Sequence, residues 1–114
     1  MAAAIFICAM ALAIDGDTLR CANVAQAEGR VRLARIDAPE RSEPTGPRAT
    51  TALRTMLSGP VTCRHVDADP RFHGFQALDR YGRIVAFCSV AGRDLSQAML
   101  SSGNAQPWPL KRHR

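Results

Sequence analysis

Three short segments of the chain carry residues whose types and spacing could act together on a phosphate ester. They are residues 14–18 (IDGDT), 32–40 (RLARIDAPE) and 79–83 (DRYGR). The carboxylates of Asp17 and Asp37 are hard oxygen donors, which suit a divalent cation such as Ca²⁺. The first two segments therefore predict a site for a hard cation.

The same segments supply groups that could hold a phosphate and handle water. A guanidinium, such as that of Arg32 or Arg83, donates two parallel hydrogen bonds to phosphate oxygens and stays charged. Hydrolysis of a phosphodiester needs such donors and a metal against the developing charge, and a carboxylate to handle water. The sequence therefore predicts metal-dependent phosphodiester hydrolysis.

Hydrophobic and turn patterns predict the elements that must position these residues. Strands are expected at residues 5–14, 18–24, 30–36, 61–66 and 83–90. One helix is expected after Pro47, because small and apolar residues recur there at helical spacing up to Gly59-Pro60. Asp94 and Gln97 form a capping box for a second, short helix that Gly103 ends.

This order of elements predicts one α+β domain over residues 1–114, mainly β. Three strands, a helix, two strands and a helix make the order of a five-stranded OB-type Greek-key barrel, a fold that often binds nucleic acid. Residues 106–114 are expected to form an irregular, basic tail.

The three segments, in this order and at this spacing, resemble the staphylococcal (micrococcal) nuclease family, also called thermonucleases. The resemblance covers about residues 8–106 and implies the same OB-type fold. Members of that family usually continue into a third, C-terminal helix. The resemblance therefore predicts that this chain, which ends at Arg114, lacks that helix.

The resemblance also implies roles for individual residues. A Ca²⁺ ion would be held by Asp17, Asp37 and the main-chain carbonyl of Ala38, where the family often has Thr. Glu40 matches the general base that activates water. The plainer alternatives are a hairpin turn for the Asp-Gly-Asp sequence and a solvated loop carboxylate for Glu40.

By the same resemblance, Arg32 and Arg83 clamp the phosphate. Arg80 and Tyr81 match a basic residue and a tyrosine that contact the terminal phosphate and the nucleotide, although Tyr81 could simply pin the start of a strand. Arg32 and Arg35 would point to opposite faces of a regular strand. The spacing to Asp37 selects Arg32 for the cleft, so we expect Arg35 on the surface.

Composition gives weaker support for a nucleic-acid partner. The net charge is +5 and the pI is about 9.7, which favour a polyanion, with nucleic acid ahead of a membrane surface. Lys111 is the one lysine among 15 basic residues, so a GC-rich genome is an alternative source of the charge. No protein partner is evident, and we expect a monomer.

The four cysteines show no spacing suited to zinc. Cys8 and Cys21 flank the first turn, while Cys63 and Cys88 flank residues 67–80. We expect disulfides Cys8–Cys21 and Cys63–Cys88, although four thiols allow three connectivities and could also stay free. Disulfides imply an oxidising compartment, and therefore a secreted or periplasmic protein.

The apolar N-terminal residues 1–13 could be a signal peptide or a buried strand. No Lys or Arg precedes this run, and cleavage near residues 9–11 would remove Cys8. We expect a buried strand, and the run is too short to span a bilayer.

The predicted function is a Ca²⁺-dependent endonuclease acting on DNA and RNA with little sequence preference. By resemblance it would leave 3′-phosphate ends. The alternative is a non-catalytic nucleic-acid-binding OB-fold module, and an inactive fragment is a third possibility. A degenerate member of the family should first lose a carboxylate or an arginine, and all of these are present, which favours the enzyme.

Overall fold

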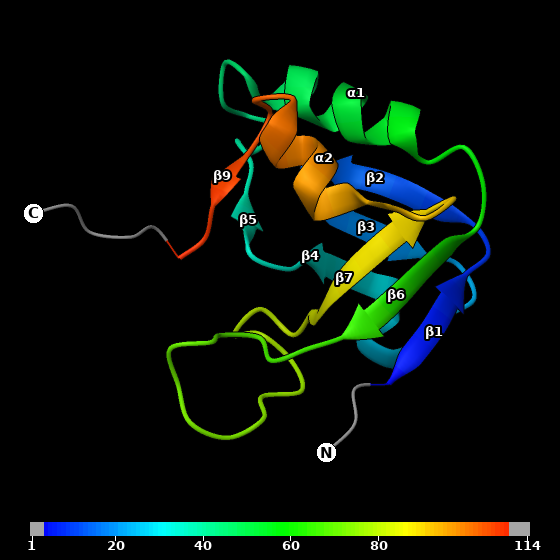
Figure 1. Cartoon of the computed structure of the whole chain (residues 1–114), viewed down its shortest axis with the longest axis vertical. Coiled ribbons are helices and arrows are strands. Elements are labelled where there is room, and N and C mark those ends of the chain that lie inside the picture. Colours follow the sequence, from blue (N-terminus) through cyan, green and yellow to red (C-terminus); the bar gives the residue numbers. More distant parts are fainter. Residues whose placement is uncertain (1–3, 110–114) are drawn as a thin grey trace, which may run out of the picture.

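The structure is a computed structural model that describes residues 4–109 (Figure 1). Its main strands are β1 (Ile5–Cys8), β2 (Ala11–Asp15), β3 (Thr18–Cys21), β4 (Arg30–Leu33), β6 (Val61–His65) and β7 (Ile84–Val90). Shorter strands are β5 (Ile36–Asp37), β8 (Arg93–Asp94) and β9 (Gln106–Pro107). The helices are the 3₁₀-helix η1 (Gln26–Gly29) and the α-helices α1 (Gly46–Met56) and α2 (Leu95–Ser101).

The main strands form one mixed sheet in the order β1-β6-β7-β4-β3-β2, with β8 at the end of β7. Only β4 and β7 pair in parallel, and the other neighbours are antiparallel. The predicted α+β fold with two α-helices among the described residues is confirmed. The sheet carries the long β6–β7 loop at one end and both helices at the other (Figure 1).

The predicted first strand, residues 5–14, is divided in two by Ala9 and Met10. β1 pairs with β6, whereas β2 pairs with β3, so the two halves lie at opposite ends of the strand order. The hydrogen-bonded path is open between β1 and β2, but these two strands are consecutive in the chain. A single bent segment therefore connects both ends of the path, as an OB-type arrangement requires.

The core lies between this sheet and the two helices. Its largest fully buried side chains include Leu19, Leu33, Ile36, Leu53, Leu95 and Met99. Helix α1 begins where the sequence predicts, with Pro in its first turn, and buries Ala49 and Leu53. Burial of these apolar side chains supplies the main stabilisation of the fold.

Gly16, in the turn between β2 and β3, allows that turn to lie against α1. A Cβ atom at this position would be 2.7 Å from the Cβ of Ala49 and 2.8 Å from the Cβ of Ala38. Glycine therefore permits a close approach that brings the first and second sequence segments together against the helix.

Both expected disulfides are confirmed. Cys63 and Cys88 lie directly opposite each other on β6 and β7, with a Cα–Cα distance of 4.0 Å. Cys8 and Cys21 are bonded with a Cα–Cα distance of 5.3 Å, but Cys21 is opposite Ala11 in its ladder. The bend at residues 9–10, rather than simple hairpin symmetry, therefore brings Cys8 to Cys21.

The expectation of irregular chain from residue 106 onward is wrong for Gln106–Pro107. These residues form β9, which pairs with β5, and the next amide, that of Trp108, donates to the carbonyl oxygen of Arg35 at 3.0 Å. A two-residue strand at an edge tolerates a proline, because one missing N–H breaks little of the ladder. Residues 110–114 lie outside the described part of the chain.

Within residues 4–109, no helix has the length and apolar character needed to cross a membrane.

Replacing Cys63 and Cys88 together by Ala should lower the free energy of unfolding by about 3 kcal/mol, because the bond constrains the unfolded chain. Urea denaturation followed by circular dichroism measures the loss, with Cys8→Ala/Cys21→Ala as the parallel variant. Titration of four thiols in the denatured, unreduced wild type would contradict the disulfides.

Candidate active site

A cleft of about 880 Å³ opens between the β2–β3 turn, the end of β4, and the long loop between β6 and β7. All the site residues predicted from the sequence line this one cleft: Asp17, Arg32, Asp37, Ala38, Glu40, Arg80, Tyr81 and Arg83. They come from segments up to 66 residues apart, since the first is Asp17 and the last is Arg83. The fold thus brings the three segments to one place, while the role of each residue stays a prediction.

Asp17 is the buried centre of this cleft, with only 6% of its surface exposed. Its Oδ2 accepts a hydrogen bond from the Ala38 amide at 2.8 Å, and its Oδ1 accepts one from the Thr18 hydroxyl at 3.0 Å. Its carbonyl oxygen accepts from the Leu33 amide at 2.7 Å. Asp17 therefore joins the β2–β3 turn both to β4 and to the segment that follows β5.

Arg32 lies between the two carboxylates that the sequence assigned to a metal. Pairing of β3 with β4 sets Arg32 opposite Thr18, and so beside Asp17. Its Nη1 is 3.4 Å from Asp17 Oδ2, and its Nη2 is 3.4 Å from Asp37 Oδ1. Nη1 also donates to the Ile36 carbonyl at 2.7 Å. The two carboxylates thus already converge on one positive charge.

Burial raises the pKa of Asp17 from 3.8 to about 6, although the nearby Arg32 guanidinium lowers it. The hydrogen bond with Asp15 raises the pKa further, and the Ala38 amide lowers it. One guanidinium therefore does not fully compensate the ionised form of this carboxylate. A second positive charge near Asp17 would favour that form.

The donor set fits a hard divalent cation. Among the described residues, no three His, Cys, Asp or Glu side chains converge on one point. The protein donors available here are the converging carboxylates of Asp17 and Asp37 and the Ala38 carbonyl, which are all oxygens. Ca²⁺ accepts carboxylates, carbonyls and water in flexible geometry, so this set suits it better than a softer metal.

Asp79 organises the third segment, a role that the sequence analysis did not assign. Its Oδ1 accepts from the amides of Tyr81 and Arg83, both at 2.9 Å, and its Oδ2 accepts from Arg83 Nε at 2.8 Å. Gly82 supplies the positive φ of 78° that this turn needs. The spacing Asp-x-Tyr-Gly-Arg was the available signal, because an Asp at the start of a turn often caps the amides that follow.

The Tyr81 ring lies beside the guanidinium groups of two arginines. The guanidinium carbons of Arg80 and Arg83 are 5.0 and 5.1 Å from the centre of its ring, and Arg80 Nη2 donates to its hydroxyl at 2.9 Å. The Tyr81 residue is nevertheless 59% exposed. This arrangement holds two cations at the cleft and leaves aromatic surface for a ligand.

Glu40 presents an unengaged carboxylate to the cleft. Its main chain is fixed, since its amide donates to Glu43 Oε1 at 2.7 Å and its carbonyl accepts from the Glu43 amide at 2.9 Å. Its exposed side chain makes no hydrogen bond with any described residue. It is therefore free to bind water.

The expectation that Arg35 lies on the surface and outside the cleft is wrong, because Arg35 lines the same cleft as Arg32. The alternation argument assumed a regular strand through residue 36, but β4 ends at Leu33 and Arg35 has a φ of +66°. A residue in a left-handed turn does not follow the alternation of a strand. Asp15 also lines the cleft, and its Oδ1 accepts from the Asp17 amide at 3.2 Å.

The raised pKa of Asp17 predicts a pH dependence of stability in metal-free protein. Asp17 binds a proton more tightly when folded, so its contribution to the free energy of unfolding is complete below pH 3.8 and is lost as the pH rises through about 6. Urea denaturation in chelator across this range should show the loss in the wild type and not in Asp17→Asn. A constant difference between the two proteins would mean that Asp17 titrates normally.

Comparison with known proteins identifies related chains. A protein named ParB from Escherichia coli is 36% identical over 109 residues, which cover 88% of this chain and 55% of ParB. An uncharacterized endonuclease of Haemophilus influenzae is 31% identical over 99 residues, or 87% of this chain and 49% of that protein. An uncharacterized endonuclease of Escherichia coli is 33% identical over 94 residues, or 81% and 54%.

The chain thus spans about half the length of the relatives it matches. A family model described as staphylococcal nuclease homologue matches residues 30–112, which include the second and third segments and the six strands from β4 to β9. Asp17 precedes the matched range, but the cleft places it against Arg32 and Ala38. The chain belongs to the staphylococcal nuclease homologue family.

Proposed function

We propose that the protein is a Ca²⁺-dependent nuclease that hydrolyses phosphodiester bonds within DNA and RNA strands, with little sequence preference. The convergence of Asp17 and Asp37 on Arg32, in a cleft that also holds Glu40 and Arg83, carries this proposal. Family membership and two relatives named as endonucleases support it.

In this proposal, Asp17, Asp37 and the Ala38 carbonyl hold Ca²⁺, which supplies Lewis-acid stabilisation of the charge that develops on the phosphate. Arg32 and Arg83 bind the scissile phosphate. Nε of Arg83 donates to Asp79 and Nη1 donates to the Thr18 hydroxyl at 3.5 Å, which fixes the guanidinium plane and leaves Nη2 for a phosphate oxygen. Both arginines are fixed in advance, so little reorganisation accompanies the reaction.

Glu40 acts on the attacking water. Its carboxylate accepts a proton as the water oxygen bonds to phosphorus, and the bond from phosphorus to the 5′ oxygen breaks. The leaving 5′ oxygen takes up a proton from solvent water, and Glu40 later returns its proton to solvent. The products are a 3′-phosphate and a 5′-hydroxyl end. Arg80 and Tyr81 bind the phosphate and the nucleotide at the end of the bound segment, where an exposed ring and two guanidinium groups lie together.

The partners in this proposal are DNA and RNA, bound by a monomer. The two disulfides indicate an oxidising compartment. We therefore place the protein in the periplasm or outside the cell.

The carboxylates give the first test. Asp17→Ala and Asp37→Ala should each weaken Ca²⁺ binding and cleavage together, because each removes a metal ligand. Glu40→Gln should cut the rate strongly while Ca²⁺ still binds. Calorimetric Ca²⁺ titration beside a cleavage assay on single-stranded DNA measures both, with Glu28→Gln, an exposed acid outside the cleft, as the control.

Two results would contradict the proposal. Full activity in chelator, or in Asp17→Ala and Asp37→Ala, would exclude the metal mechanism. A folded wild type that binds DNA without cutting it in the presence of Ca²⁺ would favour the non-catalytic binding module.

The arginine clamp gives a second test. Arg32→Ala should lower kcat by about 10²–10³-fold, because a preorganised donor to the transition state is lost. Arg20→Ala removes an equal charge from the exposed face of β3, outside the cleft, and should leave kcat unchanged. Equal losses in the two folded variants would exclude a specific role for Arg32.

A further inference from the structure

The backbone at Arg35 is unusual for its residue type. Its φ of +66° lies in the left-handed region, which disfavours any residue with a Cβ and favours glycine. The turn is nevertheless held firmly, because the Ser96 hydroxyl donates to the Ala34 carbonyl at 2.8 Å and the Trp108 amide donates to the Arg35 carbonyl at 3.0 Å. A strained position that the surrounding structure enforces is a reason to look for a function.

The Arg35 side chain also carries a charge that nearby groups compensate only in part. Its Nη1 donates to the Asp67 carbonyl at 3.0 Å, and no carboxylate of a described residue forms an ion pair with it. Partial burial lowers its pKa, although Asp67 and Asp69 act in the other direction. A guanidinium has five N–H donors, so most of those of Arg35 remain available to a ligand.

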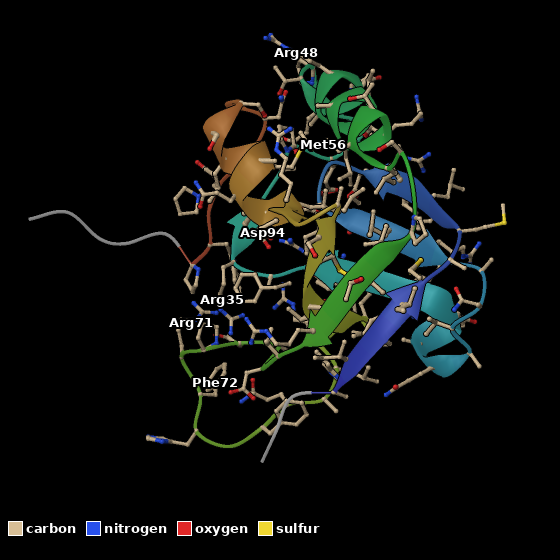
Figure 2. The ribbon with its side chains drawn as sticks, turned by 45° about the vertical axis from the view of Figure 1, so that its right-hand side comes forward. Arg35, Arg48, Met56, Arg71, Phe72 and Asp94 are labelled. Atoms are coloured by element: carbon tan, nitrogen blue, oxygen red, sulfur yellow. A yellow bond between two sulfur atoms is a disulfide. The ribbon has the colours of Figure 1, made fainter. Side chains whose placement is uncertain are left out.

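Other arginines of the cleft differ in this respect. Arg32, Arg71 and Arg83 each form an ion pair with an aspartate of the cleft. Figure 2 shows Arg35 and Arg71 on the same side of the molecule, near the end of the described chain. Arg71 is held by Asp69 through two hydrogen bonds and lies over the Trp108 ring at 5.3 Å. Among the described residues, Arg35 and Arg80 are therefore the arginines of the cleft that form no ion pair, and Arg80 is already bound to the Tyr81 hydroxyl.

We infer that Arg35 binds a phosphate that flanks the scissile one in a single-stranded polynucleotide. This inference rests on the proposed function. Arg35 bonds to Asp67 and lies near Phe87, and it makes no contact of its own with Asp17 or Asp37. It is thus separate from the clamp made by Arg32, and suited to the next phosphate along the strand.

The cleft favours a single strand over a duplex. Phe72 and Tyr81 line it with 64% and 59% of their surfaces exposed. Exposed aromatic rings beside a basic groove bind bases by stacking, which requires that the bases be unstacked from each other. A flanking phosphate is then available on the same strand as the scissile one.

The test compares two substrates that differ in flanking phosphates. A dinucleoside monophosphate has no phosphate beyond the scissile one, whereas an oligothymidylate has many. Arg35→Gln should raise KM for the oligothymidylate about tenfold or more, since it removes a charge-assisted contact, and leave KM for the dinucleotide unchanged. The matched control is Arg54→Gln, an exposed arginine on α1 that does not line the cleft.

Salt dependence provides a readout that a structural role would not move. Fluorescence anisotropy of labelled oligothymidylate measures binding without turnover when Ca²⁺ is present and every protein compared also carries Glu40→Gln. The slope of log affinity against log salt should fall in magnitude by about 0.7 in Arg35→Gln, as expected for one lost phosphate contact to a single strand. Arg54→Gln should keep the wild-type slope.

Arg35→Gly separates binding from folding. Glycine adopts the left-handed conformation without penalty, so this variant should remain folded and yet show the same raised KM and reduced slope as Arg35→Gln. Wild-type slopes in both Arg35 variants would overturn the inference. So would equal losses on the dinucleotide and the oligothymidylate, which would place Arg35 at the scissile phosphate. If the wild type cuts neither substrate, the proposed function fails, while the salt slopes still test the subsite.

Discussion

The candidate site depends on one buried carboxylate. Asp17 accepts hydrogen bonds from Thr18, from Ala38 and, through its carbonyl, from Leu33, and it faces Arg32. These contacts join a turn, a strand end and a loop that the chain makes at different places. The arrangement also makes the ionised form of Asp17 unfavourable, because burial raises its pKa to about 6 despite the neighbouring guanidinium. A proton or a divalent cation would neutralise the same buried carboxylate, so the binding of either would weaken the binding of the other.

Three arginines of the cleft follow the same pattern of pairing with an aspartate. Asp79 orients Arg83, Asp69 holds Arg71, and Asp17 and Asp37 share Arg32. In each case an aspartate fixes a guanidinium before any substrate arrives. Such pairing lowers the free charge of the cleft but fixes the direction of its donors, which favours a phosphate of defined position.

Sequence reasoning predicted the site where the local signal was chemical, and failed where it relied on regular strand geometry. The three segments, together with the family resemblance that they carry, identified eight residues that line one cleft. Arg35 was misplaced because no pattern in residues 30–36 reveals that β4 stops at Leu33. The turn that follows is imposed by Ser96 and Trp108, which lie more than sixty residues further along the chain. The pairing of β9 with β5 was not predicted either, because two-residue strands carry too little pattern to be recognised in a sequence.

The small residues behind the site have a consequence for how this family can vary. Gly16, Ala38 and Ala49 belong to the first segment, the second segment and helix α1, and they meet so closely that a Cβ on Gly16 would overlap both alanines. A larger side chain at any one of the three positions would require its neighbours to move. Substitutions among them should therefore be non-additive, with a larger residue at one position tolerated only beside a compensating rearrangement at the others. The spacing between Asp17 and helix α1 is set in this way by small residues that have no role in the proposed chemistry.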